Sequence, residues 1–392
     1  MGERSAIVVG GGISGLSAAI ALHARGWRVR VLERVPRVTE VGAGISLWAN
    51  ALRAFDHIGV GDRIRALATP EMNGGIRSRD GRFMVRVDAD EMVRRFGPAL
   101  ILHRADLLDV LVEAAAGLME GGVEVLSVSS TQDRAEVRHT GGVESADLVI
   151  GADGIRSTVR RAMWPQARPP RYAGYTAWRT VTPPLSIEDA SETWGRGMRF
   201  GYASLPDGRV YCYATANVPA GGRAGDEQAE LAELRSRFAD WHEPIPTLLR
   251  ATTNVLRHDI YELPNLPSFV RGRVALVGDA AHAMTPNLGQ GACQGGEDVA
   301  TLATLLDAYE IPEALARYDA LRRPHTQAVA RQSRQAGWLG QWRSPLAVAI
   351  RDRLLAALPM DRMLLRQLRP ILDWRCQEGL PLDAWCPGRR PS

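Results

Sequence analysis

The sequence predicts an α/β protein with a parallel nucleotide-binding sheet, an inserted antiparallel sheet and a helical C-terminal region. Three observations support this fold class. Glycine-rich segments follow apolar, strand-like runs at residues 10–15, 151–154 and 278–282. Alternating strand-like patterns replace helical ones between about residues 170 and 265, and helical periodicity dominates after residue 290. Because each glycine segment follows a strand, we expect all three to meet at one nucleotide site.

The beginning of the chain predicts a β-α-β unit that binds a dinucleotide. An apolar run at 6–9 leads into a glycine turn, a helical stretch to residue 25 and a second apolar run at 29–32. The glycines permit a tight turn, close approach of backbone N–H groups to a pyrophosphate, and close packing of helix on strand. An acidic residue ending the second strand would accept hydrogen bonds from the adenosine ribose. The predicted contacts are Gly10, Gly12, Ile13, Ser14, Gly15, Glu33 and Arg34.

The pattern of elements divides the rest of the chain. Residues up to about 165 continue with helices and strands, including a hairpin at Asp80-Gly81. The inserted segment is expected to form an antiparallel sheet over the nucleotide site, with strands at 172–181, 198–205, 209–216 and 254–263, and a helix at 226–238. Helices are expected at 291–308, 312–336 and 346–374. The predicted domains are a discontinuous nucleotide-binding domain (1–165 and 266–345), a substrate-binding β-sheet domain (166–265) and C-terminal helices (346–392).

The composition indicates a globular enzyme and disfavours other classes. A chain of 392 residues with 45% hydrophobic and 23% charged residues can bury a full core. All 48 basic residues are arginine and are scattered among 44 acidic ones, so we expect no nucleic-acid-binding face. The four cysteines form no C-x-x-C pair, which predicts no disulfide framework or metal site and favours a cytoplasmic location. No membrane span is expected, and we expect a monomer or a homodimer.

The second and third glycine segments indicate which dinucleotide binds. Gly151-Ala152-Asp153-Gly154 and Gly278-Asp279-Ala280-Ala281-His282 resemble the two signature motifs of the single-component FAD-dependent aromatic hydroxylases, the para-hydroxybenzoate hydroxylase-like monooxygenases. The resemblance runs from about residue 5 to about residue 340 and is nearest to urate hydroxylase-like members. It implies a Rossmann-type FAD-binding domain with non-covalent FAD. Asp279 would bind the ribitol hydroxyls and Asp153 would support the nucleotide site, whereas His282 is expected to satisfy backbone groups.

The resemblance also assigns residues to the flavin ring. The segment 286–291 would lie along the isoalloxazine, and the helix that begins near Gln290 would direct its positive end at the flavin pyrimidine, which favours the anionic reduced flavin. Arg104, at the start of a predicted helix, matches an arginine that reaches the FAD phosphate and ribose. A loop near residue 44 matches the flavin edge. The implied contacts are Gly44, Ile45, Arg104, Pro286, Gly289, Gln290 and Gly291.

The implied reaction is hydroxylation of an electron-rich aromatic or heteroaromatic small molecule. NADH or NADPH would reduce FAD, and O2 would form a C4a-hydroperoxide that transfers its distal oxygen. Alternatives are an epoxidase, a non-oxygenating flavin reductase or dehydrogenase, and a non-catalytic flavin- or ligand-binding protein. A nicotinamide dehydrogenase leaves the third glycine segment unexplained, and the lysine of flavin halogenases is absent because the chain has no lysine.

Arg199 and Tyr211 are the candidate substrate contacts, with Arg179 as a further candidate. Their spacing matches an arginine and a tyrosine that hold the substrate in urate hydroxylase-like members. A two-residue turn would place Tyr211 opposite Ser204, on the opposite face of the sheet from Arg199. A longer turn or a bulge would bring both side chains to one face. The turn formed by residues 206–208 therefore decides whether the two can act together.

Overall fold

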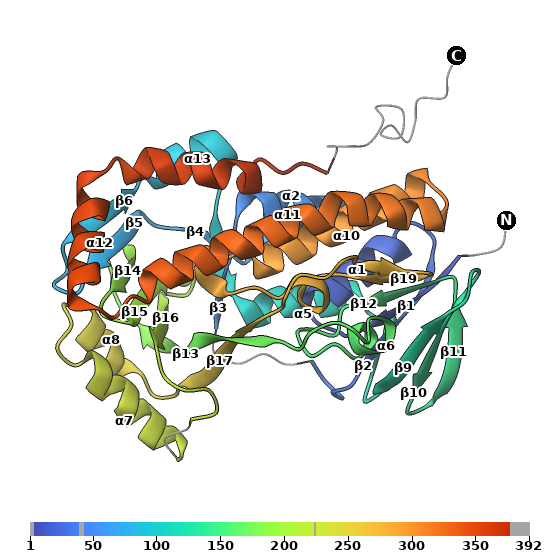
Figure 1. The fold of residues 1–392 in the computed structure, drawn as a ribbon, viewed down its shortest axis with the longest axis horizontal. Coiled ribbons are helices and arrows are strands. Elements are labelled where there is room, and N and C mark those ends of the chain that lie inside the picture. Colours follow the sequence, from blue (N-terminus) through green and yellow to red (C-terminus); the bar gives the residue numbers. More distant parts are fainter. Residues whose placement is uncertain (1–3, 39–42, 223–224, 377–392) are drawn as a thin grey trace.

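The computed structural model describes residues 4–38, 43–222 and 225–376. A six-stranded sheet, in the order β18-β19-β12-β1-β2-β8, forms one half of the molecule (Figure 1). β1 pairs in parallel with β2 and β12, and β12 pairs in parallel with β19. The carboxyl ends of β1, β12 and β19 therefore share one edge, where the three glycine segments follow. The strands are β1 (Ser5–Val9), β2 (Arg28–Glu33), β8 (Met119–Gly121), β12 (Leu148–Gly151), β18 (Val270–Arg271) and β19 (Val274–Leu276).

Helices pack on this sheet and form the main core. Every residue of β1 is buried, and α1 (Ile13–His23) buries the small residues Ala18, Ala19 and Ala21, which permit close packing. α1 packs against α10 (Gly291–Ala308), which also contacts the long helix α11 (Ile311–Gly340). The remaining helices of this half are α2 (Ala49–Ile58), α3 (Gly61–Ala66), α5 (Arg104–Ala114), α6 (Thr158–Met163), α9 (Asp279–His282) and the 3-10 turn Pro286–Leu288.

Two small sheets complete the nucleotide-binding half. One joins β3 (Gly44–Leu47), β7 (Leu100–His103) and β4 (Thr69–Pro70), and it carries the predicted flavin-edge residues Gly44 and Ile45. The other is an antiparallel meander of β9 (Val125–Ser130), β10 (Ala135–His139) and β11 (Gly142–Ala146).

A seven-stranded sheet, called the roof sheet below, has the order β17-β13-β16-β15-β14-β5-β6. It includes the β5-β6 hairpin, which the sequence assigned to the first segment, because β5 pairs in parallel with β14. The sheet therefore extends beyond residues 166–265, and β14 itself was not predicted. Its strands are β5 (Gly74–Ser78), β6 (Phe83–Val87), β13 (Arg171–Pro184), β14 (Ala190–Trp194), β15 (Met198–Ser204), β16 (Arg209–Ala216) and β17 (Leu256–Glu262).

The β15-β16 turn places the side chains of Arg199 and Tyr211 on the same face of the roof sheet. Tyr211 pairs with Ala203 rather than with Ser204, so the two-residue turn was wrong. The Leu205 N–H donates to the Arg209 carbonyl at 2.8 Å, which leaves a three-residue loop, and Gly208 adopts a φ of 80° that favours glycine. The added residue shifts the register by one, and Arg199 and Tyr211 share a face.

The two faces of the roof sheet have different partners. The outer face, with Trp178, Phe200 and Cys212, packs on α7 (Glu227–Phe238) and α8 (Ile245–Ala251). The inner face carries the polar side chains and turns toward β3 and the 286–288 turn, as the contacts of Tyr211 and Arg199 described below show.

One long helix spans both halves, and three further helices complete the fold. α11 (Ile311–Gly340) runs from the six-stranded sheet to the roof sheet (Figure 1). The single helix expected at 346–374 is divided into α12 (Pro345–Ala357) and α13 (Met360–Leu372). Leu358 is extended because a residue before proline disfavours the helical conformation, and Pro359 follows. α4 (Ala89–Phe96) packs against α13.

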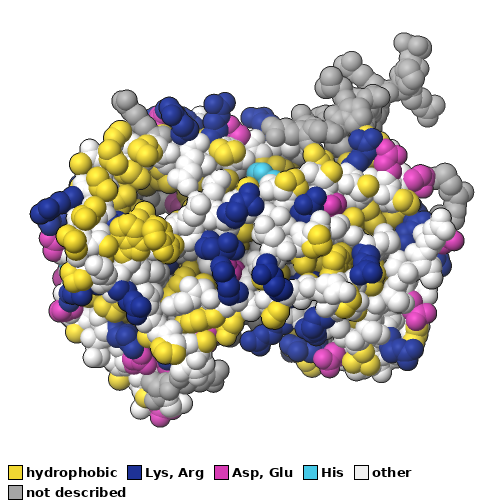
Figure 2. All heavy atoms as spheres, in the orientation of Figure 1, with side chains coloured by type: hydrophobic (Ala, Val, Ile, Leu, Met, Phe, Trp, Pro, Cys, Tyr) yellow, Lys and Arg dark blue, Asp and Glu magenta, His cyan; other side chains and the backbone are white. Residues whose placement is uncertain are grey.

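One face of the molecule carries an apolar area. Figure 2 shows hydrophobic side chains gathered around α12 and the adjoining end of α11, where Trp338, Leu346 and Ile350 are exposed. Arginine side chains are spread over the rest of this view (Figure 2). No helix in the described part of the chain is long and apolar enough to cross a membrane.

Candidate active site

The three glycine segments touch one another at the edge of the six-stranded sheet. A Cβ built on Gly10 would lie 2.5 Å from the Ala152 carbonyl oxygen, and one on Gly15 would lie 1.9 Å from the Gly10 oxygen. A Cβ on Gly278 would lie 2.4 Å from Ser14 Oγ. Only glycine permits these approaches, so the sequence brings the segments together through close backbone packing.

Two helix starts leave open space at this edge. Apart from their own chain neighbours and helix backbone, no atom lies within 4 Å of the position that a Cβ would take on Gly12 or on Gly291. Gly12 precedes α1 and Gly291 begins α10, and neither helix start has a side-chain cap. The N–H groups of both helices are therefore placed to bind an anionic or polar ligand group.

Two predicted cofactor carboxylates also hold the surrounding loops. Glu33 accepts hydrogen bonds from the Gly11 N–H at 2.6 Å and the Val35 N–H at 2.9 Å, while Arg34 is exposed. Asp153 Oδ2 accepts from the Thr158 and Val159 N–H groups at 2.6 and 3.1 Å, which caps α6. Burial raises the pKa of Asp153. The structure thus shows a loop-anchoring role for both residues, and their contacts with a nucleotide stay predictions.

Asp279 projects from a firmly held turn. Its side chain is exposed, whereas Gly278 and Ala280 on either side are buried. Gly278 has a φ of 57°, and its N–H donates to Asp298 Oδ2 at 3.0 Å. His282 Nε2 lies 2.6 Å from the same oxygen, so it binds a side-chain carboxylate rather than the backbone groups expected from the sequence.

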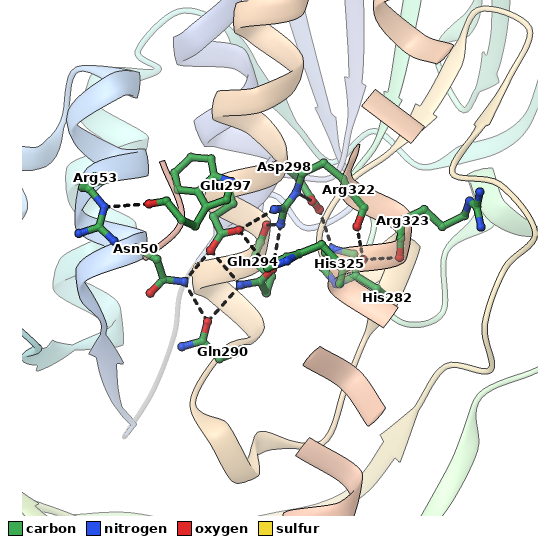
Figure 3. Close-up of polar contacts among 12 residues, drawn as sticks. Asn50, Arg53, His282, Gln290, Gln294, Glu297, Asp298, Arg322, Arg323 and His325 are labelled. Carbon is green, nitrogen blue, oxygen red and sulfur yellow. Dashed lines mark hydrogen bonds and ion pairs between the residues drawn. The ribbon is translucent and has the colours of Figure 1, made fainter. Parts of the chain in front are cut away.

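A buried polar network lies behind this turn (Figure 3). Arg322 of α11 donates to Glu297 at 2.6 Å and to Asp298 at 2.8 Å, and all three side chains are nearly inaccessible to solvent. Burial raises the pKa of Glu297. Burial also acts to raise the pKa of Asp298, but His282 and Arg322 outweigh it and the pKa is lowered. The network therefore ties α9, α10 and α11 together beneath the candidate cofactor site.

The predicted contact Gln290 takes part in the same network. Its Oε1 accepts from Asn50 Nδ2 at 3.0 Å and from Gln294 Nε2 at 3.1 Å (Figure 3). Asn50 Nδ2 also donates to Glu297 at 2.6 Å. The network uses only Oε1 of Gln290; its Nε2 has no hydrogen-bond partner among the described residues, so this N–H group and the backbone at the start of α10 are both left for the expected flavin contact.

The predicted flavin edge lies directly against Tyr211. A Cβ on Gly44 would lie 2.7 Å from Cγ of the Tyr211 ring, so a larger residue at 44 would collide with it. The Arg104 N–H, at the start of α5, donates to the Ala43 carbonyl at 3.0 Å. Burial raises the pKa of Tyr211, and the positive charges of Arg179 and Arg104 oppose this shift. The charges of the predicted residues Arg104 and Arg179 therefore both act on the Tyr211 hydroxyl.

Arg199 joins the roof sheet to the 286–291 segment. Arg199 is 3% exposed, and its guanidinium donates to Glu192 at 3.0 Å and to Asn287 at 2.7 Å. The Tyr175 hydroxyl donates to the same Asn287 oxygen at 3.2 Å. Sequence reasoning missed Glu192, Asn287 and Tyr175. Asn287 lay inside a predicted cofactor segment, which was a usable signal, but Glu192 lies on the unpredicted strand β14.

The described residues contain no disulfide bond and no cluster of side chains that could hold a metal ion. Cys212, Cys293 and Cys376 are free thiols, and no group of three or more candidate metal ligands occurs in this part of the chain. Burial raises the pKa of Cys293 to about 12, and its Sγ donates to the Gly289 carbonyl at 3.5 Å.

The comparisons with known proteins agree with this architecture. A family model described as an FAD binding domain matches residues 3–333. The two helix starts with open space at Gly12 and Gly291 fit the anionic groups of FAD, such as its phosphates. The exposed carboxylate of Asp279 fits the ribitol hydroxyls. The chain belongs to this family of FAD-dependent aromatic hydroxylases.

Curated relatives cover nearly the whole chain. It is 37% identical over 366 residues to the aurachin C monooxygenase/isomerase of Stigmatella aurantiaca, covering 91% of this chain and 95% of that protein. It is 35% identical to the 2-heptyl-3-hydroxy-4(1H)-quinolone synthase of Pseudomonas aeruginosa, with coverages of 90% and 94%. The FAD-dependent urate hydroxylase of Klebsiella pneumoniae is 34% identical, with coverages of 81% and 85%.

A solved structure shares the fold. HpxO of Klebsiella pneumoniae, complexed with FAD and uric acid, superposes with a TM-score of 0.87 at 28% identity, covering 94% of this chain and 97% of that one. The predicted fold class is confirmed. The protein is an FAD-dependent monooxygenase that hydroxylates aromatic small molecules, with NAD(P)H and O2 as co-substrates.

Proposed function

We propose that the substrate is an uncharged 4-quinolone-type ring with an apolar substituent, oxygenated at an electron-rich ring carbon. The name of the relative with 35% identity, a 2-heptyl-3-hydroxy-4(1H)-quinolone synthase, supports a quinolone. The surroundings of Arg199 in this chain support the choice of an uncharged ring. The positive charge of Arg199, the residue expected to fix an anionic ring, is already balanced by Glu192, and Asn287 accepts a further hydrogen bond from the same guanidinium.

The inner face of the roof sheet supplies the groups that would hold such a ring. Tyr211 and Tyr213 lie on this face with their ring centroids 6.0 Å apart. Arg179 lies directly opposite Tyr213 in the β13-β16 register. Aromatic rings pack against a planar substrate, and the charge of Arg179 would stabilise negative charge that develops on a ring oxygen.

One set of residues would hold FAD, and another set would place the substrate. FAD, when bound, supplies electron transfer from NAD(P)H and the activation of O2. We assign Gly12, Asp279 and the 286–291 segment to holding it, and Arg199, Tyr211 and Arg179 to placing the substrate. The protein must fix the ring and exclude water, because a substrate held an ångström out of place loses productive oxygen transfer.

Several finer properties are part of the proposal. We assign non-covalent FAD, because the one cysteine near the flavin segment, Cys293, is a buried thiol directed at a backbone carbonyl. The free thiols of Cys212, Cys293 and Cys376 support a cytoplasmic location. We keep a monomer or a homodimer as the expected state, and both NADH and NADPH as candidate reductants.

A substrate panel tests the proposed function. The purified holoenzyme is given 2-heptyl-4-quinolone, urate, salicylate or 6-hydroxynicotinate, and NAD(P)H oxidation, product and hydrogen peroxide are measured for each. We expect the quinolone to accelerate NAD(P)H oxidation most and to give more oxygenated product than peroxide. Faster and better-coupled turnover of one of the three anionic compounds would refute the quinolone assignment.

A further inference from the structure

Asn287 connects the 286–291 segment to the roof sheet through its side-chain oxygen. Oδ1 accepts hydrogen bonds from Arg199 Nη2 of β15 at 2.7 Å and from the Tyr175 hydroxyl of β13 at 3.2 Å. An amide oxygen has two lone pairs, so both of its acceptor positions are used. The roof sheet thus holds this side chain from two different strands.

The side-chain nitrogen of Asn287 connects the same segment to α11. Nδ2 donates to the Ser333 carbonyl at 2.8 Å and to Thr285 Oγ1 at 2.8 Å. A Cβ on Gly337 of α11 would lie 2.3 Å from Nδ2, so a larger residue there would displace the amide. Because both N–H groups and both lone pairs are occupied, the amide has no hydrogen-bonding position left for a ligand.

Arg199 is held at both ends of its guanidinium. Nη1 donates to Glu192 of β14 at 3.0 Å, while Nη2 donates to Asn287. The hydrogen bond to Asn287 is charge-assisted, and the buried arginine has little water to replace it. A Cβ on Gly340 would lie 2.9 Å from Arg199 Cδ, so α11 also packs closely against this side chain. Arg199 and the 286–291 segment therefore hold each other in place.

We propose that Asn287 is a positioning residue that fixes the 286–291 segment against the roof sheet and so sets where the substrate lies relative to FAD. The inference rests on the proposed function, in which the segment holds FAD and the roof sheet holds the substrate. Asn287 acts through Arg199 and touches neither ligand, since its amide is fully bonded within the protein. Without this link each ligand would still bind, but their separation and orientation would no longer be fixed.

A purely structural role for Asn287 makes a different prediction. Loss of the amide lowers the stability in either case, but only a positioning role changes how much reducing power reaches the substrate. Asn217 is a matched amide, because its Nδ2 donates to the Gln341 carbonyl at 2.9 Å and lies 2.9 Å from the position of a Cβ on Gly197. Asn217 follows β16 and Gln341 follows α11, so this amide also joins the roof sheet to α11, through residues outside the 286–291 segment.

Asn287→Ala and Asn217→Ala separate the two roles, with the best substrate of the panel. We expect Asn287→Ala to keep its FAD content and to lower the ratio of oxygenated product to hydrogen peroxide by about tenfold. Asn217→Ala should keep the parent ratio, although its urea midpoint should fall by an amount similar to that of Asn287→Ala. A parent-like ratio in Asn287→Ala, or an equal loss in Asn217→Ala, would overturn the proposal.

The absorption spectrum of bound FAD gives a readout without turnover. Substrate added to the oxidised holoenzyme perturbs the flavin bands according to how its ring lies against the isoalloxazine. Asn287→Ala should saturate with substrate and give a difference spectrum of altered shape, whereas Asn217→Ala should give the parent spectrum. A parent difference spectrum in Asn287→Ala would count against any role of this amide in placing the substrate.

A double variant tests whether Asn287 acts through Arg199. Arg199→Met should lower the product-to-peroxide ratio by itself, and adding Asn287→Ala should lower it no further, because the two residues form one link. Additive losses, or parent-like coupling in Arg199→Met, would overturn this route. The substrate is whichever panel compound the parent oxygenates, so a wrong substrate class is detected in the panel and not in these ratios.

Discussion

Replacing Arg322 with methionine is expected to destabilise the protein by about 3–5 kcal/mol, because it leaves two buried carboxylates without their cation. Arg322 is 2% exposed and contacts both Glu297 and Asp298, which are completely buried. The measurement is the urea midpoint of the variant against the parent. Arg317→Met on the same helix is the matched control, since Arg317 forms an exposed, solvent-screened pair with Glu313 that contributes little to stability.

A triple variant tests the same cluster without leaving unpaired buried charges, so the test does not depend on whether Arg322→Met folds. Neutralising the whole cluster with E297Q, D298N and R322M together removes the uncompensated charges and should recover part of the lost stability. A single Arg322→Met change no more costly than the Arg317→Met control would show that the buried network contributes nothing particular to stability.

Asp279→Ala is expected to weaken FAD binding by about tenfold to 150-fold. The exposed carboxylate would lose charge-assisted hydrogen bonds to the ribitol hydroxyls, worth roughly 1.5–3 kcal/mol. Titration of the apoprotein with FAD, followed by flavin fluorescence, gives the Kd. Because Asp279 is exposed, the melting temperature of the apoprotein should change little.

Asp307→Ala is the matched control for the FAD titration. Asp307 is an exposed acidic residue at the far end of α10, paired with Arg25. It should bind FAD with the parent Kd. Unchanged FAD affinity in Asp279→Ala would remove Asp279 from the cofactor site.

The parts of the site that depend on local backbone rules could be predicted from the sequence. The β-α-β unit and the glycine segments follow from residue spacing, because strand, turn and helix are adjacent in the chain. The boundaries of α10 and of β16 agree with the expected 291–308 and 209–216. β16 alternates half-buried and buried residues over most of its length, and α10 begins directly after the glycine-containing turn at 286–290.

The parts of the fold and of the site that could not be predicted from the sequence depend on contacts between distant segments. The parallel pairing of β14 with β5 joins residues more than a hundred positions apart, and no local pattern marks it. Glu192 and Asn287 meet at Arg199 from two separate elements, so neither stands out in the sequence. The face occupied by Tyr211 depended on a single added residue in the 206–208 loop.

The coupling ratio of Tyr211→Phe tests most directly whether the aromatic substrate binds between the roof sheet and the flavin segment. The ratio compares oxygenated product with NAD(P)H consumed, using the best substrate of the panel, and Tyr202→Phe on the outer face is the control. Loss of the Tyr211 hydroxyl should leave FAD content unchanged and lower the ratio, because a misplaced substrate lets reducing equivalents escape as hydrogen peroxide. Parent-like coupling and substrate affinity in Tyr211→Phe, or an equal loss in Tyr202→Phe, would contradict this placement of the substrate.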